Sequence, residues 1–286
     1  MHVQVNGVRL FFDVEGAGMV PDGSTLRQKP VLLLLHGGPG YDHSVFKPMF
    51  SAFADICQVV YLDHRGQGRS EAGPEDRWTL AQWGDDVRAF CDALGIEKPI
   101  VLGQSFGGYV AQSYATRHAD HPGKLILSST IARKVPERVS AMFRKLGGPE
   151  AQRIADAFWD DPNPETQAAY ERVCYPLYNT RHDMFTGDGA ARVVRRPEVL
   201  LHFRKRPDGE IHRMNFLPDL PKVRCPTLVM AGEEDPVTPA DDAAEMAAAI
   251  PQHLVRFQRF PGCGHGVFRD APEEGLTAIR RFILLS

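Results

Sequence analysis

Short, unbroken apolar runs recur along this chain and constrain its fold more than any other feature of the sequence. The clearest run, Val31–Leu35, follows Pro30 and ends at a glycine-rich stretch. An apolar run that does not alternate with polar residues is typical of a strand buried on both faces of a sheet. Residues 254–260 alternate instead, which indicates a last strand nearer the edge. Further unbroken runs lie at 57–62, 99–103, 124–128 and 226–231.

Helical periodicity separates these runs. It is clearest over 80–94, where apolar side chains recur at steps of three and four positions. Thr79 with Gln82 predicts the cap that begins this helix, and Gly95 predicts its end. Further helices are predicted from Phe106, from Thr238-Pro239 with the proline at the first helical position, and around Leu276, Ile279 and Phe282.

The alternation of strands and helices predicts an α/β fold, built on a mostly parallel eight-stranded sheet with helices on both faces. The first two strands, 2–6 and 8–14, are expected to form a hairpin because Asn6-Gly7 between them is a strong turn signal. Residues 131–221 have helical patterns but no buried strand run. We therefore expect a core domain of residues 1–130 and 222–286, and a helical cap of residues 131–221 over the sheet's carboxyl edge.

Charge and cysteine content narrow the classes of function. The formal net charge of -3 gives no electrostatic reason to expect a nucleic-acid partner. No apolar run is long enough to cross a bilayer, and the N-terminus alternates as a strand does instead of forming a signal peptide. The scattered cysteines favour neither a disulfide framework nor a zinc site. We expect a cytoplasmic protein without metal or other cofactor and without a membrane partner, acting on a small molecule or short peptide; its oligomeric state stays open.

One predicted strand leads directly into a glycine-flanked serine. Gly103-Gln104-Ser105-Phe106-Gly107 matches G-x-S-x-G, with strand 99–103 before it and a predicted helix after it. This context is what a nucleophile elbow requires, because the sharp turn needs small residues on either side of the serine. The turn would place Ser105 Oγ near a helix N-terminus, where free N–H groups favour developing negative charge. We interpret Ser105 as a nucleophile; the alternative is a glycine-rich turn with an incidental serine.

A serine hydroxyl is a weak nucleophile and needs a base within hydrogen-bond reach. With an elbow of this kind, the acid and then the histidine are expected after later strands of the sheet. Asp235 follows strand 226–231 and is the best candidate acid; its other possible role is a turn or helix cap. Its competitors are the neighbouring Glu233 and Glu234. His265 lies in a glycine-rich loop after the last strand, so we expect it to act as general base with Asp235 orienting its imidazole.

An acyl-transfer site also needs donors for the oxyanion. One is expected to be the backbone N–H of Phe106, at the start of the helix that follows the elbow. The other is expected from His36-Gly37-Gly38-Pro39-Gly40, because glycines allow a backbone N–H to approach the substrate. We favour the N–H of Gly38 and expect Gly37 to line the substrate site. The donor-rich loop 63–70 is interpreted as a brace for this oxyanion loop.

In these motifs the chain resembles the α/β-hydrolase superfamily over essentially its whole length, and within it the prolyl iminopeptidase group. The resemblance implies an α/β-hydrolase fold, a covalent acyl-enzyme and a helical cap that shapes the substrate pocket. Gln104, Phe106 and His64 depart from that group, whose elbow more often reads GGSWG and whose later loop more often begins DQRG. The motifs that carry the resemblance are HGGPG at 36–40, DHRGQGRS at 63–70, GQSFGG at 103–108, GEEDPVTP at 232–239 and GCGHGVF at 262–268.

The resemblance leaves the substrate open. In the prolyl iminopeptidase group, cap glutamates bind the free amino group of the substrate, and Glu165 and Glu171 lie in the corresponding stretch here. The cap is also rich in aromatic residues such as Trp159, which either receive an apolar acyl group or form the cap's own core. We predict a serine hydrolase, of aminopeptidase or carboxylesterase type, that cleaves a small carboxylic ester or amide. The alternatives are a lactonase or macrocyclic-ester esterase and, in another class, a catalytically inactive hydrolase fold that serves as a binding protein.

Overall fold

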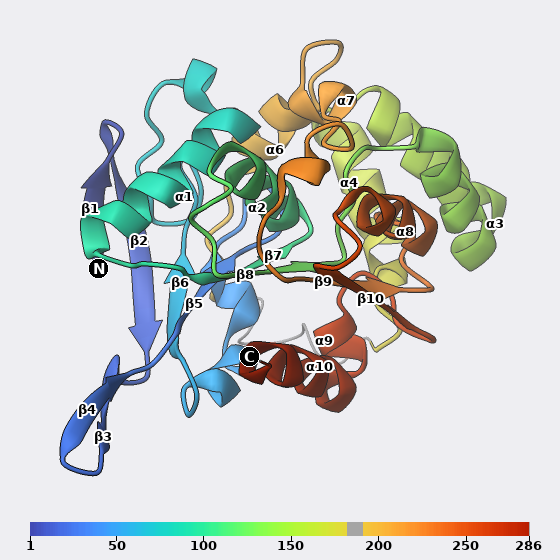
Figure 1. The fold of residues 1–286 in the computed structure, drawn as a ribbon. Coiled ribbons are helices and arrows are strands. Elements are labelled where there is room, and N and C mark those ends of the chain that lie inside the picture. The colour runs from blue at the N-terminus through green and yellow to red at the C-terminus, as the bar shows by residue number, and fades with distance from the viewer. Residues whose placement is uncertain (182–190, 286) are drawn as a thin grey trace.

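The computed structural model of the protein describes residues 1–181 and 191–285 (Figure 1). Within these residues the main sheet has eight strands in the order β1-β2-β6-β5-β7-β8-β9-β10. β2 pairs antiparallel with β1 and β6, and the other neighbours pair in parallel, so the predicted mostly parallel sheet is confirmed. The strands of this sheet are β1 (His2–Val5), β2 (Val8–Glu15), β5 (Val31–Leu35), β6 (Gln58–Leu62), β7 (Ile100–Gln104), β8 (Lys124–Ser128), β9 (Thr227–Gly232) and β10 (Val255–Phe260).

Helices connect the parallel strands, because the chain must cross back to the opposite edge of the sheet before the next parallel strand can begin. The described α-helices are α1 (Leu80–Leu94), α2 (Phe106–Arg117), α3 (Pro136–Asp160), α4 (Pro164–Val173), α6 (Pro197–Arg204), α7 (Glu210–Arg213), α8 (Ala240–Ala249), α9 (Val267–Asp270) and α10 (Pro272–Leu284). Short 3-10 helices lie at η1 (His43–Phe46), η2 (Met49–Phe53), η3 (Glu75–Arg77), η4 (Tyr175–Leu177) and η6 (Leu220–Lys222).

Both faces of the sheet are buried, which explains the unbroken apolar runs. Successive side chains of a strand point to opposite faces, and in β5 Leu33 and Leu35 join one core while Leu32 and Leu34 join the other. The first core also contains residues of α1, α2 and α8, and the second contains residues of η1, η2, α9 and α10. Figure 1 shows α1 and α2 on one side of the sheet and α10 on the other. The prediction of helices on both faces is confirmed.

Local signals in the sequence set several element ends as predicted. Asn6 and Gly7 have φ values of 45° and 82° at the β1–β2 turn, and a tight type I′ hairpin needs positive φ at both positions. Thr79 accepts a hydrogen bond from Gln82 N at the start of α1. Gly95 ends this helix with a left-handed φ of 63°, which costs glycine little because it has no Cβ.

Two local features differ from the sequence prediction. Pro239 is the residue before α8 and not its first helical residue, so the helix begins at Ala240. A second, two-stranded sheet of β3 (Met19–Asp22) and β4 (Thr25–Gln28) was not predicted. Its side chains are mostly exposed and carry no apolar alternation, so the sequence held no burial signal for it.

The chain between β8 and β9 is helical where the structure describes it. α3, α4, α6 and α7 lie on the side of the sheet that also carries α2 and α8 (Figure 1). Phe143 of α3 and Phe203 of α6 belong to the same buried core as that face of the sheet. α3 bends at Gly148, where φ is 74° and Pro149 follows. Within the described ranges, no helix is long and apolar enough to cross a membrane.

Candidate active site

Ser105 lies at the sharp turn between β7 and α2. Its φ and ψ of 54° and −120° are a combination that residues with a side chain rarely adopt, at a cost of about 1–3 kcal/mol. Hydrogen bonds from neighbouring β8 and its loop hold the turn: Ser105 N donates to Ser128 O at 3.1 Å, and Thr130 Oγ1 donates to Ser105 O at 2.9 Å. The chain therefore has the strained elbow geometry that G-x-S-x-G predicts, with the serine between strand and helix.

Two glycines make this turn possible. A Cβ atom on Gly103 would lie 2.3 Å from Gly107 O, and one on Gly107 would lie 2.0 Å from Leu35 O. Carbon and oxygen atoms that are not bonded cannot approach so closely, so any larger residue would push α2 away from β5 and β7. The flanking glycines thus set how near the elbow lies to the oxyanion loop that follows β5.

Three side chains from distant parts of the sequence meet in a hydrogen-bonded chain. His265 Nε2 lies 2.9 Å from Ser105 Oγ, and His265 Nδ1 lies 2.8 Å from Asp235 Oδ2. Ser105, His265 and Asp235 are 7%, 5% and 0% exposed. The Asp235 carboxylate has no hydrogen to donate, so Nδ1 carries the proton and Nε2 keeps its lone pair toward the serine hydroxyl. This arrangement can remove a proton from Ser105 Oγ.

The buried Asp235 carboxylate is held by several donors. Its Oδ1 accepts from the backbone N–H groups of Val237 and Thr238, each at 2.8 Å. Its Oδ2 accepts from Thr238 Oγ1 at 2.6 Å as well as from His265. A buried anion without a neighbouring cation needs such donors to offset its lost hydration. Thr238 was read from the sequence only as the start of a helix; a threonine three residues after an aspartate, typical of a side-chain turn, was the available signal.

The two rival acids lie outside this chain of hydrogen bonds. Glu234 forms an ion pair with Lys145 at 2.9 Å, and Glu233 is exposed.

His265 itself is positioned by the helical segment, since its backbone N–H donates to Tyr178 O at 2.5 Å and its ring meets the Tyr178 ring edge to face at 5.3 Å. Nothing in the local sequence around Tyr178 indicates this contact.

The loop after β5 lies beside the elbow, and both Gly37 and Gly38 line the cavity that contains Ser105. Gly38 has a φ of 130°, which only glycine adopts readily. Burial lowers the pKa of His36, so this imidazole is neutral near pH 7. Its Nε2 accepts from His64 N at 3.3 Å, which leaves Nδ1–H to donate to Gly37 O at 2.8 Å. Phe106 supplies a first helical N–H, which has no partner within the helix.

Loop 63–70 braces the glycine-rich loop after β5 through buried side chains. Gln67 Oε1 accepts a hydrogen bond from Gly40 N at 2.7 Å, and both residues are buried. Asp63 accepts from the backbone N–H groups of His43 and Arg69, each at 2.9 Å. These contacts agree with the bracing role interpreted from the sequence.

Replacement of Gln67 by methionine is expected to weaken folding. The side chain of similar size would leave the buried Gly40 N–H without its acceptor, at a cost of about 1–3 kcal/mol of unfolding free energy. Urea unfolding measures this effect. Gln258→Met, at an exposed position of β10, is the control, and equal behaviour of the two variants would contradict the brace.

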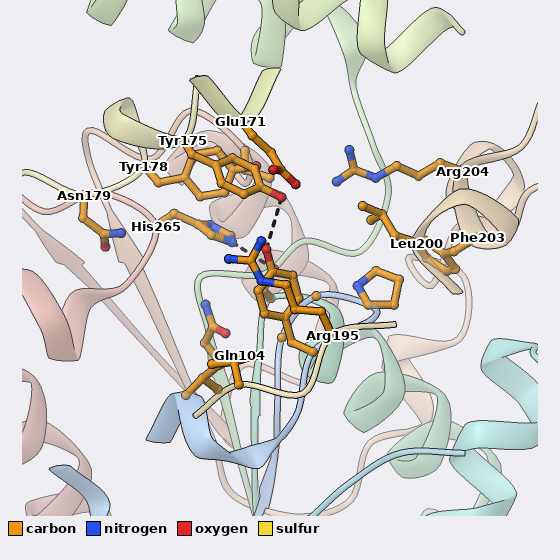
Figure 2. Close-up of a pocket in the computed structure, with 18 of the residues that line it drawn as sticks. Gln104, Glu171, Tyr175, Tyr178, Asn179, Arg195, Leu200, Phe203, Arg204 and His265 are labelled. Atoms are coloured by element: carbon orange, nitrogen blue, oxygen red, sulfur yellow. Dashed lines mark hydrogen bonds between the residues drawn. The ribbon is translucent and has the colours of Figure 1, made fainter. Parts of the chain in front are cut away.

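A cavity of about 530 Å³ opens over Ser105 and His265, a size suited to a small-molecule ligand. The sheet side contributes Gly37, Gly38 and Gln104, whereas the remaining walls come largely from the helical segment. Figure 2 shows Tyr175, Tyr178 and His265 on one side of the pocket and Leu200, Phe203 and Arg204 on the other. The cavity thus forms only where the sheet edge and the helical segment meet.

The expected substrate-binding residues divide into two sets. Gly37, Trp159 and Glu171 line the cavity. Glu165 does not: it is exposed in the first turn of α4, the helix that the Asn163 side chain caps. Arg204 and Tyr178 also line the cavity. Tyr178 is one of the cap aromatics, whereas nothing in the local sequence separates the buried Arg204 from the exposed Lys205 and Arg206 that follow it.

The sequence model of the family described as alpha/beta hydrolase fold matches residues 30–272. A proline iminopeptidase from Lactobacillus crispatus (strain ST1) is 27% identical over 289 residues and covers 90% of each chain. A protein of Caulobacter sp. (strain K31), provisionally named carbamate hydrolase RutD, is 28% identical over 282 residues, or 96% of this chain and 95% of its own. The crystal structure of VinJ has a TM-score of 0.80 at 22% identity, covering 99% of this chain and 97% of that one.

Proposed function

Because the chain belongs to the α/β-hydrolase family, we propose that it is a serine hydrolase that cleaves small carboxylic esters or amides through an acyl-enzyme. The observation that carries this proposal is the hydrogen-bonded chain from Ser105 Oγ through His265 to the buried Asp235. A nucleophile, a base and an orienting acid in this geometry are what acyl transfer to serine requires.

The proposed reaction has two stages. Ser105 Oγ attacks the acyl carbon while His265 Nε2 takes the hydroxyl proton, and the oxyanion accepts hydrogen bonds from the N–H groups of Phe106 and Gly38. His265 then gives this proton to the departing alcohol or amine, which leaves an ester on Ser105. In the second stage a water molecule loses a proton to His265 and its oxygen attacks the acyl carbon. His265 then returns this proton to Ser105 Oγ as the bond to the acyl carbon breaks, which releases the carboxylic acid and restores the free serine. Asp235 stabilises the imidazolium in both stages.

Residues 131–221 act in this proposal as a cap over a core of residues 1–130 and 222–286. The cap supplies Trp159, Tyr178 and Leu200 to the cavity, and these apolar surfaces suit an apolar acyl or leaving group. The core supplies the reacting groups. A change of substrate should therefore be achieved by substitutions in the cap, with the chemistry retained.

A fluorophosphonate probe tests the proposal directly. It should attach covalently to Ser105, as located by peptide mass spectrometry, because the activated hydroxyl attacks phosphorus as it attacks an acyl carbon. Heat-unfolded protein is the control and should not react. A folded protein that is not labelled would instead favour the inactive binding-protein alternative.

Activity is expected to fall as the solution is acidified. Protonation of His265 removes the lone pair that accepts the Ser105 proton, so the reaction loses its base in acid. The measurement is kcat/KM for an aryl ester as a function of pH, with circular dichroism at each pH as a check on folding. A rate that stays constant into strongly acidic solution while the protein remains folded would contradict a histidine base.

A panel of substrates separates the substrate classes. Similarity to proline iminopeptidases favours a substrate with a free amino group, and Glu171 is the acidic residue that could receive it among the described residues lining the cavity. Preference for proline arylamide, lost in Glu171→Gln, would support that class. Preference for aryl esters or lactones would instead support an esterase or lactonase. The labelling test is independent of this choice.

A further inference from the structure

Arg204 is a buried cation at the cavity, at the last position of α6. It is 8% exposed and lines the same cavity as Ser105 and His265. Among the residues that the structure describes, none forms a hydrogen bond with Arg204 Nη1, and none forms an ion pair with the guanidinium. Buried charges in proteins are normally paired, because losing water without a partner is costly.

Aromatic rings hold the guanidinium in place. Arg204 Cζ lies 3.8 Å from the centroid of the Trp159 ring and 4.9 Å from that of Phe158. Lys134 Nζ also lies over the Trp159 ring, at 3.4 Å. Contact with aromatic faces orients the guanidinium, while its Nη1 has no acceptor among the described residues. Arg204 is therefore preorganised to donate hydrogen bonds to something in the cavity.

Arginines outnumber acids among the described residues that line the cavity, although the chain as a whole has a net charge of -3. Among the described lining residues, four are arginines (Arg181, Arg195, Arg204 and Arg269) and the one acid that accompanies them is Glu171. Figure 2 shows the Glu171 carboxylate and the Arg204 guanidinium facing one another across one end of the pocket. Burial, followed by the charges of Arg204 and Arg206, lowers the pKa of Lys134 to about 6.

We propose that Arg204 binds a carboxylate group carried by the substrate of the reaction proposed above, on which this inference rests. A carboxylate matches the planar fork of a guanidinium and would supply the missing acceptors for its N–H groups. Its single negative charge also suits a site with one facing carboxylate, since Glu171 would repel a doubly charged phosphate more strongly. A substrate whose only charge is an ammonium group would meet the repulsion of Arg204.

Two matched pairs of esters test this on the wild-type protein. The first pair is the nitrophenyl monoester of adipic acid and nitrophenyl hexanoate, which differ in a carboxylate on the acyl chain. The second pair is carboxyphenyl hexanoate and phenyl hexanoate, which differ in a carboxylate on the leaving group. We expect kcat/KM to favour the carboxylated ester by about tenfold or more in one pair, as a charged hydrogen bond provides.

In the pair that shows the preference, Arg204→Gln should lower the ratio of kcat/KM for the carboxylated ester to kcat/KM for the uncharged ester by about 10-fold to 100-fold. Arg204→Lys, which keeps the charge but not the fork, should retain part of the preference. The control is Arg206→Gln, which removes the same charge from a side chain that pairs with Asp160 outside the cavity. A ratio that falls equally in the control would point to net charge and overturn a site at Arg204.

Binding without catalysis separates this inference from the proposed function. Adipate should bind to Ser105→Ala in calorimetry, and binding should be lost when Arg204→Gln is added. If no ester is hydrolysed but adipate binds through Arg204, the proposed function fails and the carboxylate site stands. If esters are hydrolysed without preference in either pair and adipate does not bind, the carboxylate site is wrong. The wild-type arms need no substitution at Arg204, so a variant that fails to fold would not leave the question undecided.

Discussion

Ser105→Ala is expected to lower kcat/KM for any hydrolysed ester by at least about 10³-fold, because the proposed acyl-enzyme forms on the Ser105 hydroxyl. The remaining rate would reflect binding and the oxyanion donors alone. Folding should be retained, since the strained backbone of the elbow is held by main-chain hydrogen bonds and not by its own hydroxyl: Ser105 N donates to Ser128 O, and Ser105 O accepts from Thr130 Oγ1. The measurement is steady-state ester hydrolysis, together with thermal unfolding of the variant.

The matched control for this variant is Ser113→Ala. Ser113 is also buried and lies on α2, the helix that follows the elbow, but it does not line the cavity. It should keep activity near that of the wild type. Comparable losses in the two variants would mean that the effect of Ser105→Ala arises from damage to α2 and not from a lost nucleophile.

Asp235→Asn is expected to lower kcat by about 10⁴-fold, because the ring proton of His265 would then lie on Nε2, the nitrogen that must accept the Ser105 proton. The surroundings of Asp235 dictate this result. Its Oδ1 accepts from two backbone N–H groups, of Val237 and Thr238, so an amide would keep its oxygen there and turn its NH₂ group toward His265. Nδ1 would then have to accept, Nε2 would carry the proton, and Ser105 would lose its base.

Glu234→Gln serves as the control for that prediction. Glu234 adjoins Asp235 in sequence but pairs with Lys145, so its neutralisation should change kcat by little. The pH profile gives a second readout. Asp235→Asn should recover part of its rate at higher pH, because hydroxide can then replace His265 as the base. A large loss of kcat in Glu234→Gln together with a small loss in Asp235→Asn would show that Asp235 is not the acid that orients His265.

Much of the sheet could be predicted because its signals are local. The unbroken run Val31–Leu35 indicates a strand buried on both faces, without knowledge of any partner strand. Asn6-Gly7 indicates a tight hairpin because these residue types readily adopt positive φ, as both do in the structure. The β3–β4 hairpin was missed because its residues bury little apolar surface and so leave no pattern. The predicted start of α8 was wrong by one position, because a proline is suited both to the residue before a helix and to its first residue.

The candidate site divides in the same way. Ser105, Asp235 and His265 each follow a strand of a parallel sheet, and the carboxyl ends of such strands lie at one edge, so chain order alone predicts that they meet. Trp159 and Glu171 could be proposed only as members of the cap, and Glu165 could not be distinguished from Glu171. Which of the two faces the cavity depends on the rotation of α4, and the helix packing that sets it is not encoded in a local motif.

The sequence by itself determined the α/β architecture and the order of the reacting groups, because backbone conformation and strand burial follow from neighbouring residues. Only the tertiary structure decided what surrounds those groups. Thr238 reaches the Asp235 carboxylate, Tyr178 accepts a hydrogen bond from the backbone of His265, and Arg204 lies over the Trp159 ring within the cavity. These contacts join segments far apart in the chain, and their energies depend on burial and distance, which no stretch of sequence contains.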